Sequence, residues 1–310
     1  MGENLIPQFP LYIPSKGRSG YMVTSKYLTY MGVRHYIVVE PSELDDYKEA
    51  IKSMDLLATA VELDLAYKER YELCDNYGLA KSTGPGPARN FAWDHSKSNG
   101  HNWHWVIDDN IRAFKRLNKN EKVKVASGSF FKAMEDFCLR YVNVSMAGPN
   151  YMAFAPARTK MPPFITNTRI YSCNFIRNDA PFRWRGRYNE DTILSLDMLK
   201  ARWCTIQFNA FLQDKMQTQA MAGGNTSEFY HADDKPQEGQ KYSKTGTIDK
   251  SRMMLTEHPD VSRVVYKFGR IHHSVDYRPF KRNKLIRRQG IEMPSGINNY
   301  EMALKKKSPA

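Results

Sequence analysis

Two adjacent aspartates follow a short apolar run in the first half of the chain. The apolar residues 105–107 precede Asp108 and Asp109, and Asn110 completes the turn. Mg²⁺ and Mn²⁺ prefer hard oxygen ligands, and a cation held by carboxylates at a strand end can bridge a diphosphate. The same residues also suit a turn in which aspartates only cap the backbone. The motif therefore predicts either a metal site or a structural turn.

A second acidic pair, Glu190 and Asp191, stands directly before a helical pattern of apolar residues. Asn189 can cap that helix, and the helix dipole keeps carboxylates in its first turn ionised. A capping box is the structural alternative. A fixed, ionised carboxylate can also take the proton of a hydroxyl that attacks the anomeric carbon of a sugar. Asp191 is thus the candidate general base, and Glu190 is its nearest rival.

Cations accompany these acidic motifs. Lys16 and Arg18 follow the first predicted strand, and Arg89 lies in the glycine- and proline-rich turn 83–90. Fixed cations beside a leaving nucleotide diphosphate lower the barrier to its departure, although surface cations are common without such a role. The chain has neither GxGxxG nor GxxxxGK[ST], which argues against a dinucleotide fold and a P-loop.

A histidine pair, His272 and His273, follows an apolar stretch late in the chain. One of the two can supply a further metal ligand, and a purely structural pair is the alternative.

The net charge of +13, from 46 Lys and Arg against 33 Asp and Glu, suits either a polyanionic partner or a merely basic soluble protein, and the position of the cations favours the partner. Cations crowd the C-terminal part and alternate there with aromatic residues, a pattern that suits phosphate contacts and base stacking. These cations are Arg263, Lys267, Arg270, Arg278, Lys281, Arg282, Lys284, Arg287 and Arg288.

Composition places the chain among globular proteins, with 41% hydrophobic and 25% charged residues. No apolar run approaches the ~20 residues of a spanning helix, and the N-terminus lacks a secretory pattern, so we expect no membrane association and a cytoplasmic location. The four cysteines are far apart and predict neither a zinc knuckle nor a disulfide framework.

The elements that must position these residues alternate between strands and helices. Crossover helices between strands predict a parallel sheet at the start of the chain. The predicted strands are 11–14, 35–40, 58–64, 105–107, 151–154, 169–175 and 202–212, and the predicted helices are 22–31, 42–54, 91–100, 129–142 and the segment after 189. Residues from Gln213 to about Asp260 read as a long polar loop.

The order of these motifs resembles that of GT-A fold glycosyltransferases. The motifs are SKGR (15–18), GPGPARN (84–90), IDDNI (107–111) and GRYNED (186–191), followed by a late histidine. Within that fold the chain resembles the family associated with TET/JBP-type base oxygenases in phage genomes, which is linked to glycosylation of hydroxymethylated pyrimidines in DNA. The resemblance covers about residues 10–275.

The resemblance implies an α/β fold of the GT-A type, a Rossmann-like mixed sheet flanked by helices. The expected catalytic domain is 1–275, with a nucleotide-sugar half of about 1–112 and an acceptor half of about 113–275. A basic extension, 276–310, follows it. In a phage-encoded enzyme the location would be the host cytoplasm.

The resemblance also implies site residues. The acidic turn would bind the metal and the ribose, Asp191 would be the base of an inverting enzyme, and His272 or His273 would complete the metal site. The turn reads Asp-Asp-Asn and not Asp-x-Asp, so the motif leaves open whether Asp108 or Asp109 binds the metal.

The sequence thus predicts metal-dependent transfer of a sugar from a UDP-sugar to a modified pyrimidine in DNA, with 5-hydroxymethylcytosine as the expected base. A glycosyltransferase for glycans or small molecules and a non-catalytic nucleic-acid-binding protein are the alternatives. The predicted donor contacts are Pro14, Ser15, Lys16, Arg18, Arg89 and Asp108, and the metal candidates are Asp108, Asp109, Asn110, His272 and His273. The predicted acceptor contacts are Arg183, Trp184, Arg185, Arg187, Tyr188, Asn189, Gly223, Gly224, Asn225, Arg287 and Arg288.

Overall fold

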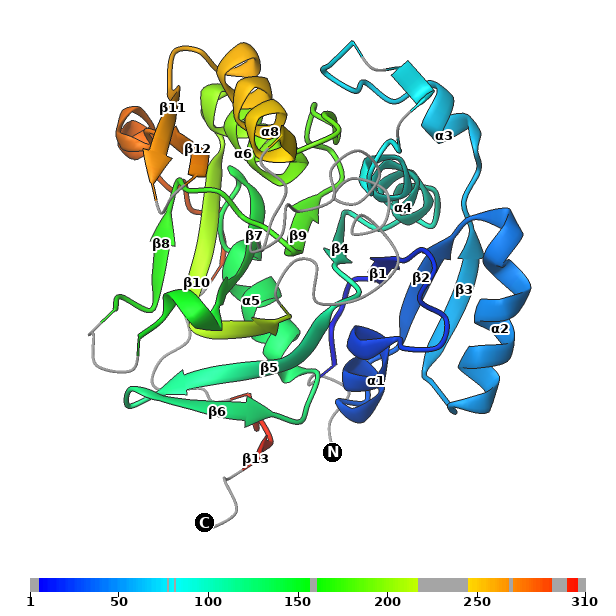
Figure 1. Cartoon of the computed structure of the whole chain (residues 1–310). Coiled ribbons are helices and arrows are strands. Elements are labelled where there is room, and N and C mark those ends of the chain that lie inside the picture. Colours follow the sequence, from blue (N-terminus) through cyan, green and yellow to red (C-terminus); the bar gives the residue numbers. More distant parts are fainter. Residues whose placement is uncertain are drawn as a thin grey trace.

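The computed structural model describes residues 6–76, 78–80, 82–156, 161–216, 245–267, 270–291 and 300–305. These residues form one large mixed sheet flanked by helices, together with a small two-stranded sheet (Figure 1). The predicted α/β fold, with a mixed sheet of the GT-A kind, is confirmed.

The first half of the chain builds a parallel part of the sheet. Its elements are β1 (Leu11–Pro14), α1 (Val23–Tyr30), β2 (His35–Val39), η2 (Pro41–Glu43), α2 (Leu44–Ser53), β3 (Ala58–Glu62), α3 (Ala66–Glu69), η3 (Gly78–Ala80), α4 (Gly86–Ser98) and β4 (Trp103–Ile107). The strands lie in the order β4, β1, β2, β3 and pair in parallel. Their carboxyl ends therefore share one edge of the sheet, which places the segment after β1 beside the acidic turn after β4.

The second half extends the same sheet with mixed pairing. Its elements are β5 (Ile111–Asn118), β6 (Glu121–Val125), α5 (Ser129–Leu139), β7 (Val144–Tyr151), η4 (Met152–Phe154), β8 (Phe164–Thr166), β9 (Cys173–Arg177), α6 (Glu190–Lys200) and β10 (Cys204–Lys215). Strand β9 lies between β4 and β7 and is antiparallel to both. Strand β10 is parallel to β7 and antiparallel to β5 and β8. The end of β10 therefore reaches the same edge as the acidic turn.

Alternation along the strands sorts the core into two faces, because successive side chains of a strand point to opposite sides. Leu11 and Ile13 of β1 pack in a cluster with residues of α1 and α5. Tyr12, between them, packs instead with Ala92 of α4. Helix α6 covers the same face as α4, since Leu194 shares a cluster with Trp93. The sheet is thus a middle layer between two layers of helices.

The C-terminal part packs on this core. Its elements are α8 (Thr245–Glu257), β11 (Ser262–Lys267), β12 (Arg270–Val275), η5 (Arg278–Arg282) and β13 (Leu304–Lys305). Strand β13 adds to the sheet at β6. The Asn283 amide donates to the carbonyl oxygens of Leu199 and Trp203, and Phe280 is buried. The described residues after 275 are therefore held by the catalytic core, while the boundary at 275 stays a prediction.

Three predicted elements need correction. Residues 213–260 are not one loop, because β10 continues to Lys215 and α8 occupies 245–257. The strand expected at 151–154 ends at Tyr151 and gives way to η4, and the strand expected at 169–175 begins only at Cys173. Within the described ranges no helix has the length and apolarity that a bilayer-spanning segment needs.

Candidate active site

A pocket of about 330 Å³ opens at the carboxyl edge of the parallel strands. The acidic turn after β4 lines it together with the segment after β1, the N-terminus of α6 and the end of β10. Most of the predicted donor and catalytic residues line it, among them Pro14, Ser15, Lys16, Arg18, Arg89, Asp108, Asp109, Asn110, Glu190 and Asp191. The fold therefore brings four separate sequence motifs into one cavity.

Arg89 connects the two acidic motifs. Its guanidinium lies 2.8 Å from Asp108 Oδ1, 2.8 Å from Asp191 Oδ1 and 3.1 Å from Glu190 Oε1. The side chain is only 2% exposed, so it acts inside the protein and not as a surface cation. One buried cation thus fixes the separation between the turn after β4 and the start of α6.

The glycine-rich turn explains how α4 comes close enough to α6 for these contacts. A Cβ on Gly86 would lie 1.9 Å from the hydroxyl oxygen of Tyr71, so only glycine fits there. That hydroxyl donates to the carbonyl oxygen of Gly186, in the loop before α6 (3.0 Å). The turn and the loop are therefore held against the same tyrosine.

Asp108 is held on both carboxylate oxygens. Arg89 binds Oδ1, and Lys215 at the end of β10 places its Nζ 2.5 Å from Oδ2. Burial raises the pKa of Asp108, but Lys215 and Arg89 outweigh it and lower that pKa to about 2. Asp108 is consequently ionised at every physiological pH.

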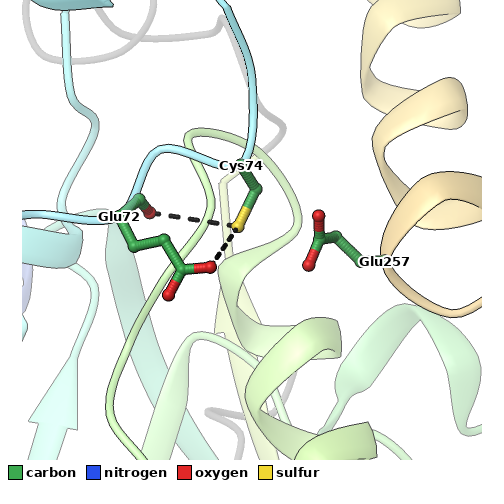
Figure 2. Close-up of side chains that lie close together, drawn as sticks. All are labelled: Glu72, Cys74 and Glu257. Atoms are coloured by element: carbon green, nitrogen blue, oxygen red, sulfur yellow. Dashed lines mark hydrogen bonds between the residues drawn. The ribbon is translucent and has the colours of Figure 1, made fainter.

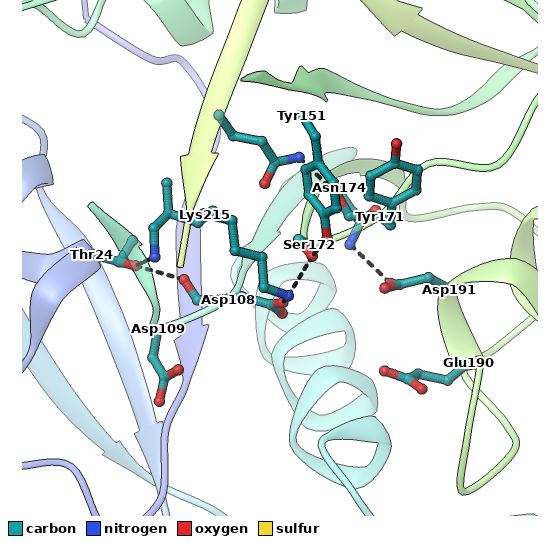
Figure 3. A network of polar contacts seen from close by, with 12 residues as sticks. Thr24, Asp108, Asp109, Tyr151, Tyr171, Ser172, Asn174, Glu190, Asp191 and Lys215 are labelled. Atoms are coloured by element: carbon teal, nitrogen blue, oxygen red, sulfur yellow. Dashed lines mark hydrogen bonds and ion pairs between the residues drawn. The ribbon is translucent and has the colours of Figure 1, made fainter. Parts of the chain in front are cut away.

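Asp109 faces the segment after β1. Its Oδ1 lies 2.5 Å from the guanidinium of Arg18, and its Oδ2 accepts a hydrogen bond from the Ser15 hydroxyl (2.9 Å). Burial raises the pKa of Asp109, and the Arg18 cation and the Ser15 hydrogen bond only partly offset that effect. The two aspartates of the turn thus have different partners, and Figure 3 shows their side chains pointing in different directions.

Glu190 and Asp191 begin α6 on the opposite side of the pocket from the acidic turn (Figure 3). Asp191 also accepts a hydrogen bond from the Asn174 amide (3.2 Å). Burial raises the pKa of both carboxyl groups, and Arg89 opposes that rise. A carboxylate with a raised pKa, fixed by two donors, is suited to accept a proton from a substrate hydroxyl.

Asn189 does not cap α6 with its side chain, which corrects the sequence prediction. Its backbone is left-handed, with φ of 57°, and its amide donates to the carbonyl oxygen of Lys250 on α8 (2.6 Å). The residue therefore ties α6 to α8 beside the pocket.

Lys16 forms an ion pair, as the more buried Arg18 and Arg89 do. Its Nζ lies 3.1 Å from Glu40 Oε1 at the end of β2, and its side chain is 40% exposed. Glu40 also binds Lys68, just after the start of α3. These residues form the outer rim of the donor side of the pocket.

Sequence reasoning missed several polar residues of the pocket. Lys215 and Ser172 are hydrogen-bonded to each other (2.8 Å), and Tyr151 and Ser172 share a hydrogen bond of 2.5 Å. Tyr151 and Tyr171 meet edge to face with ring centroids 4.2 Å apart. No motif marks these positions, because β7, β9 and β10 bring them together only when the sheet forms.

The histidine pair lies on β12, and His273 lines the pocket. Burial lowers the pKa of His273 to about 4, so its ring is neutral at pH 7 and able to ligate a metal. His272 is not part of the pocket lining. Both roles at a metal stay predictions.

Among His, Cys, Asp and Glu of the described ranges, one group of three has ligand atoms within 4.8 Å of one another, and it lies outside the pocket. It comprises Glu72, Cys74 and Glu257 (Figure 2). The guanidinium of Arg185 already binds Glu257, and it lies 3.3 Å from Cys74 Sγ and 3.4 Å from Glu72 Oε1. An arginine thus supplies the positive charge that this group would otherwise need.

The basic loop before α6 is more buried than its sequence indicated. Trp184 and Arg187 are each 1% exposed, and Arg187 binds Asp75 and the carbonyl oxygens of Gly78 and Ser82. Their burial argues against stacking of Trp184 on a base and against free phosphate contacts by Arg187, and both acceptor roles stay predictions.

The other predicted acceptor residues of this loop differ in their contacts and exposure. Arg185 binds Asp197 and Glu257, so its charge is already neutralised inside the protein. Arg183 is 39% exposed and stacks its guanidinium on the ring of Trp93. Tyr188 lines the pocket. Arg187 and Asn189 line it as well, whereas Arg183 does not.

The other predicted acceptor contacts lie apart from this loop. Gly223, Gly224 and Asn225 fall outside the described residues. Arg287 and Arg288 are exposed, and a bridge to Tyr141 places them near the start of β7, whereas Tyr151 at its end lines the pocket. Their distance from the pocket is therefore about the length of that strand.

The large mixed sheet flanked by helices is a GT-A-like α/β architecture. Residues 9–224 match the family model described as TET-Associated Glycosyltransferase, which is more than half of the chain. The chain belongs to the TET-associated glycosyltransferase family. Such an enzyme uses a nucleotide sugar as donor. No curated protein matches the sequence significantly.

Proposed function

We propose that the protein transfers a sugar from a UDP-sugar to the hydroxymethyl oxygen of a modified pyrimidine in DNA, with 5-hydroxymethylcytosine as the expected base. The observation that carries this proposal is the Arg89 contact set, which holds the acidic turn and Asp191 in one pocket. A donor bound at the turn and an acceptor beside α6 would meet between them.

The donor side is formed by the carboxyl ends of the parallel strands. Ser15 and Arg18 lie against Asp109, and Pro14 and Lys16 line the same wall. Ligands of open α/β sheets bind at this edge, and fixed cations there stabilise a developing diphosphate. These residues are the proposed contacts of the nucleotide sugar.

The residues of the acidic turn fit a divalent cation of the Mn²⁺ or Mg²⁺ kind. Asn110 Oδ1 is buried and has no hydrogen-bond partner among the described residues, so this oxygen is available as a metal ligand. Such cations are commonly held by one or two protein oxygens together with substrate phosphates and water. Asp108, Asp109 and Asn110 would hold the cation, with His273 as a further ligand. When bound, it would neutralise charge on the diphosphate.

Asp191 is the proposed general base. It would accept the proton of the acceptor hydroxyl while that oxygen forms a bond to the anomeric carbon. The bond from this carbon to the phosphate oxygen breaks, and UDP leaves with the electron pair. A single in-line displacement of this kind inverts the anomeric configuration.

Exposed cations of the C-terminal part support DNA as the acceptor. A base stacked in a duplex cannot place its hydroxymethyl group beside Asp191, so it must be flipped out or presented in a distorted strand. On the β11–β12 hairpin, Arg263 and Lys267 are exposed, and the strand register places them on the face opposite to His273, which lines the pocket. They are the proposed contacts for DNA that extends past the hairpin, outside the pocket.

Release of UDP tests the proposed reaction. The protein is incubated with UDP-sugars and Mn²⁺, with DNA containing 5-hydroxymethylcytosine, with unmodified DNA, or with no acceptor. We expect UDP release that depends on the hydroxymethylated DNA. Equal release with all three would point to hydrolysis or another acceptor, and a glycan-specific enzyme would ignore DNA.

The DNA contact itself predicts a strong salt dependence of affinity, because bound cations release counterions from phosphates. Replacing Arg263 and Lys267 by Ala should reduce the slope of log K against log salt by about 2. The paired change Arg287→Ala, Arg288→Ala tests the C-terminal cations in the same way. Fluorescence anisotropy over a salt series measures both, and a salt-independent wild-type affinity would contradict the DNA proposal.

A further inference from the structure

Lys215 is the last residue of β10, and no sequence motif marks it. Its side chain is 17% exposed and lines the pocket between the acidic turn and Tyr151. Nζ contacts Asp108 Oδ2 at 2.5 Å and Ser172 Oγ at 2.8 Å, and it lies 5.9 Å from the centroid of the Tyr151 ring. Figure 3 shows this ammonium group beside Asp108, across the pocket from Glu190 and Asp191.

The ammonium group remains charged in this environment. Burial lowers the pKa of Lys215, but Asp108 and Tyr151 outweigh it and raise that pKa above its ordinary value. An ammonium has three N–H donors. Two of them are used by Asp108 and Ser172, and within the described ranges Nζ has no third hydrogen-bond partner. A charged donor that lines the pocket is therefore available to a ligand.

Lys215 and Arg89 share the neutralisation of Asp108, and Arg89 is itself shared with Glu190 and Asp191. Arg89 already binds the other oxygen of the same carboxylate at 2.8 Å. A buried ion pair is weak support for stability, because desolvation offsets much of its attraction. The ion pair with Asp108 is therefore weak evidence for a purely structural role of Lys215.

We infer that Lys215 is a further diphosphate-binding residue, whose ammonium group contacts the phosphates of the leaving nucleoside diphosphate and is held on Asp108 while the donor is absent. The inference rests on the proposed function, since it takes a nucleoside diphosphate as the ligand. In the transfer step Lys215 gives up no proton and stabilises the negative charge that the leaving phosphate oxygen gains.

Lys215 also competes with any cation for Asp108. Both oxygens of this carboxylate are engaged in the structure, so Asp108 is open to a further cation only when Lys215 moves to a ligand. The donor would therefore draw Lys215 away and improve the turn as a cation site. Removal of the lysine charge should therefore weaken the binding of a nucleoside diphosphate and strengthen the binding of a divalent cation.

Isothermal titration of three variants tests the inference. Lys215→Met keeps the length of the side chain and removes its charge, and Lys215→Arg keeps the charge. Lys132→Met is the matched control, because Lys132 pairs with Asp136 on α5 and is also 17% exposed, but does not line the pocket. The probes are UDP in EDTA, UDP with Mn²⁺, and Mn²⁺ alone, and thermal unfolding checks that each variant is folded.

We expect Lys215→Met to bind UDP in EDTA about 10- to 100-fold more weakly than wild type, the effect of a lost charge-assisted hydrogen bond. The same variant should bind Mn²⁺ alone more tightly than wild type. Lys215→Arg should recover most of the UDP affinity, and Lys132→Met should change neither affinity.

Wild-type UDP affinity in a folded Lys215→Met variant would overturn the inference and leave the proposed function intact. If Lys215→Met does not fold, a UDP affinity of Lys215→Arg far below that of wild type would overturn it in the same way. Failure of the wild-type protein to bind UDP, with or without Mn²⁺, would overturn the proposed donor and the inference together.

Discussion

Two arginines of this protein each gather several carboxylates, and the two assemblies differ in what surrounds them. The Arg89 cluster comprises Arg89, Asp108, Glu190 and Asp191, and the Arg185 cluster comprises Arg185, Glu72, Asp197 and Glu257. The Arg89 side chain is 2% exposed, and its carboxylates line the pocket at the sheet edge. Arg185 is 20% exposed and joins α6 to α8.

The difference teaches that an acidic cluster gains a chemical role from its position in the fold. In the Arg89 cluster, a second cation and an unpartnered amide oxygen stand beside the carboxylates, from Lys215 and Asn110. In the Arg185 cluster, the carboxylates Asp197 and Glu257 belong to two helices that the arginine connects. We therefore expect the first cluster to serve chemistry and the second to serve stability.

The largest effect should come from removing the arginines. Arg89→Met leaves three carboxylates without their shared buried cation, and breaking a buried pair in this way costs about 3–5 kcal/mol of unfolding free energy. Arg185→Met should cost only about 1 kcal/mol, because Arg185 is 20% exposed and its partner Glu72 is 65% exposed. Urea denaturation measures both. Equal losses would show that the two clusters do not differ in burial as the structure indicates.

The next effect concerns the acidic turn. Because its oxygens fit a divalent cation that binds a diphosphate, Asp109→Ala should abolish transfer and the thermal stabilisation that a UDP-sugar gives. Chelation of the wild-type protein with EDTA should do the same. Glu257→Gln is the matched change in the Arg185 cluster and should leave both properties unaltered. Full wild-type activity in EDTA would remove the metal from the mechanism.

The proposed general base gives the third test. Asp191→Asn preserves the size of the side chain and removes its proton acceptor, so we expect normal UDP and DNA binding and a transfer rate lower by about 10²-fold or more. Glu190→Gln is measured beside it. Loss of activity in Glu190→Gln alone would move the base by one position, and activity in both variants would contradict the inverting mechanism.

The smallest effect is a pH dependence in the Arg185 cluster. His258 is buried and 3.7 Å from Asp197 Oδ1, and burial lowers its pKa below the ordinary value of 6.5. The unfolded chain therefore binds more protons than the folded one, and stability falls as the pH drops below about 6.5. His258→Gln should reduce this fall by less than about 1 kcal/mol.

Urea denaturation at pH 8 and at pH 5.5 measures the effect. Other buried histidines with lowered pKa, such as His35 and His104, should keep part of the pH dependence in the variant. An identical pH dependence in His258→Gln and wild type would exclude a contribution from the Arg185 cluster.

The sequence by itself determined the order of the strands and helices in the parallel half and the fold class. Apolar periodicity and the glycine and proline residues at the ends of elements are local signals. They located β1, β2, β3 and the turn after β4 closely. The same signals located Arg89, Asp108, Asp109 and Asp191, since each lies in a short motif. The family match is consistent with that order of motifs.

Only the tertiary structure decided which side chains face the pocket and which are buried. Trp184 and Arg187 lie in a basic segment that reads as surface, but Tyr71 and Asp75 draw that segment into the core. Lys215 lies in no motif, and it reaches Asp108 because β10 and β4 end at the same edge of the sheet although 107 positions separate the two residues. Burial and contact between distant strands depend on packing of the whole sheet, which local patterns along the chain do not record.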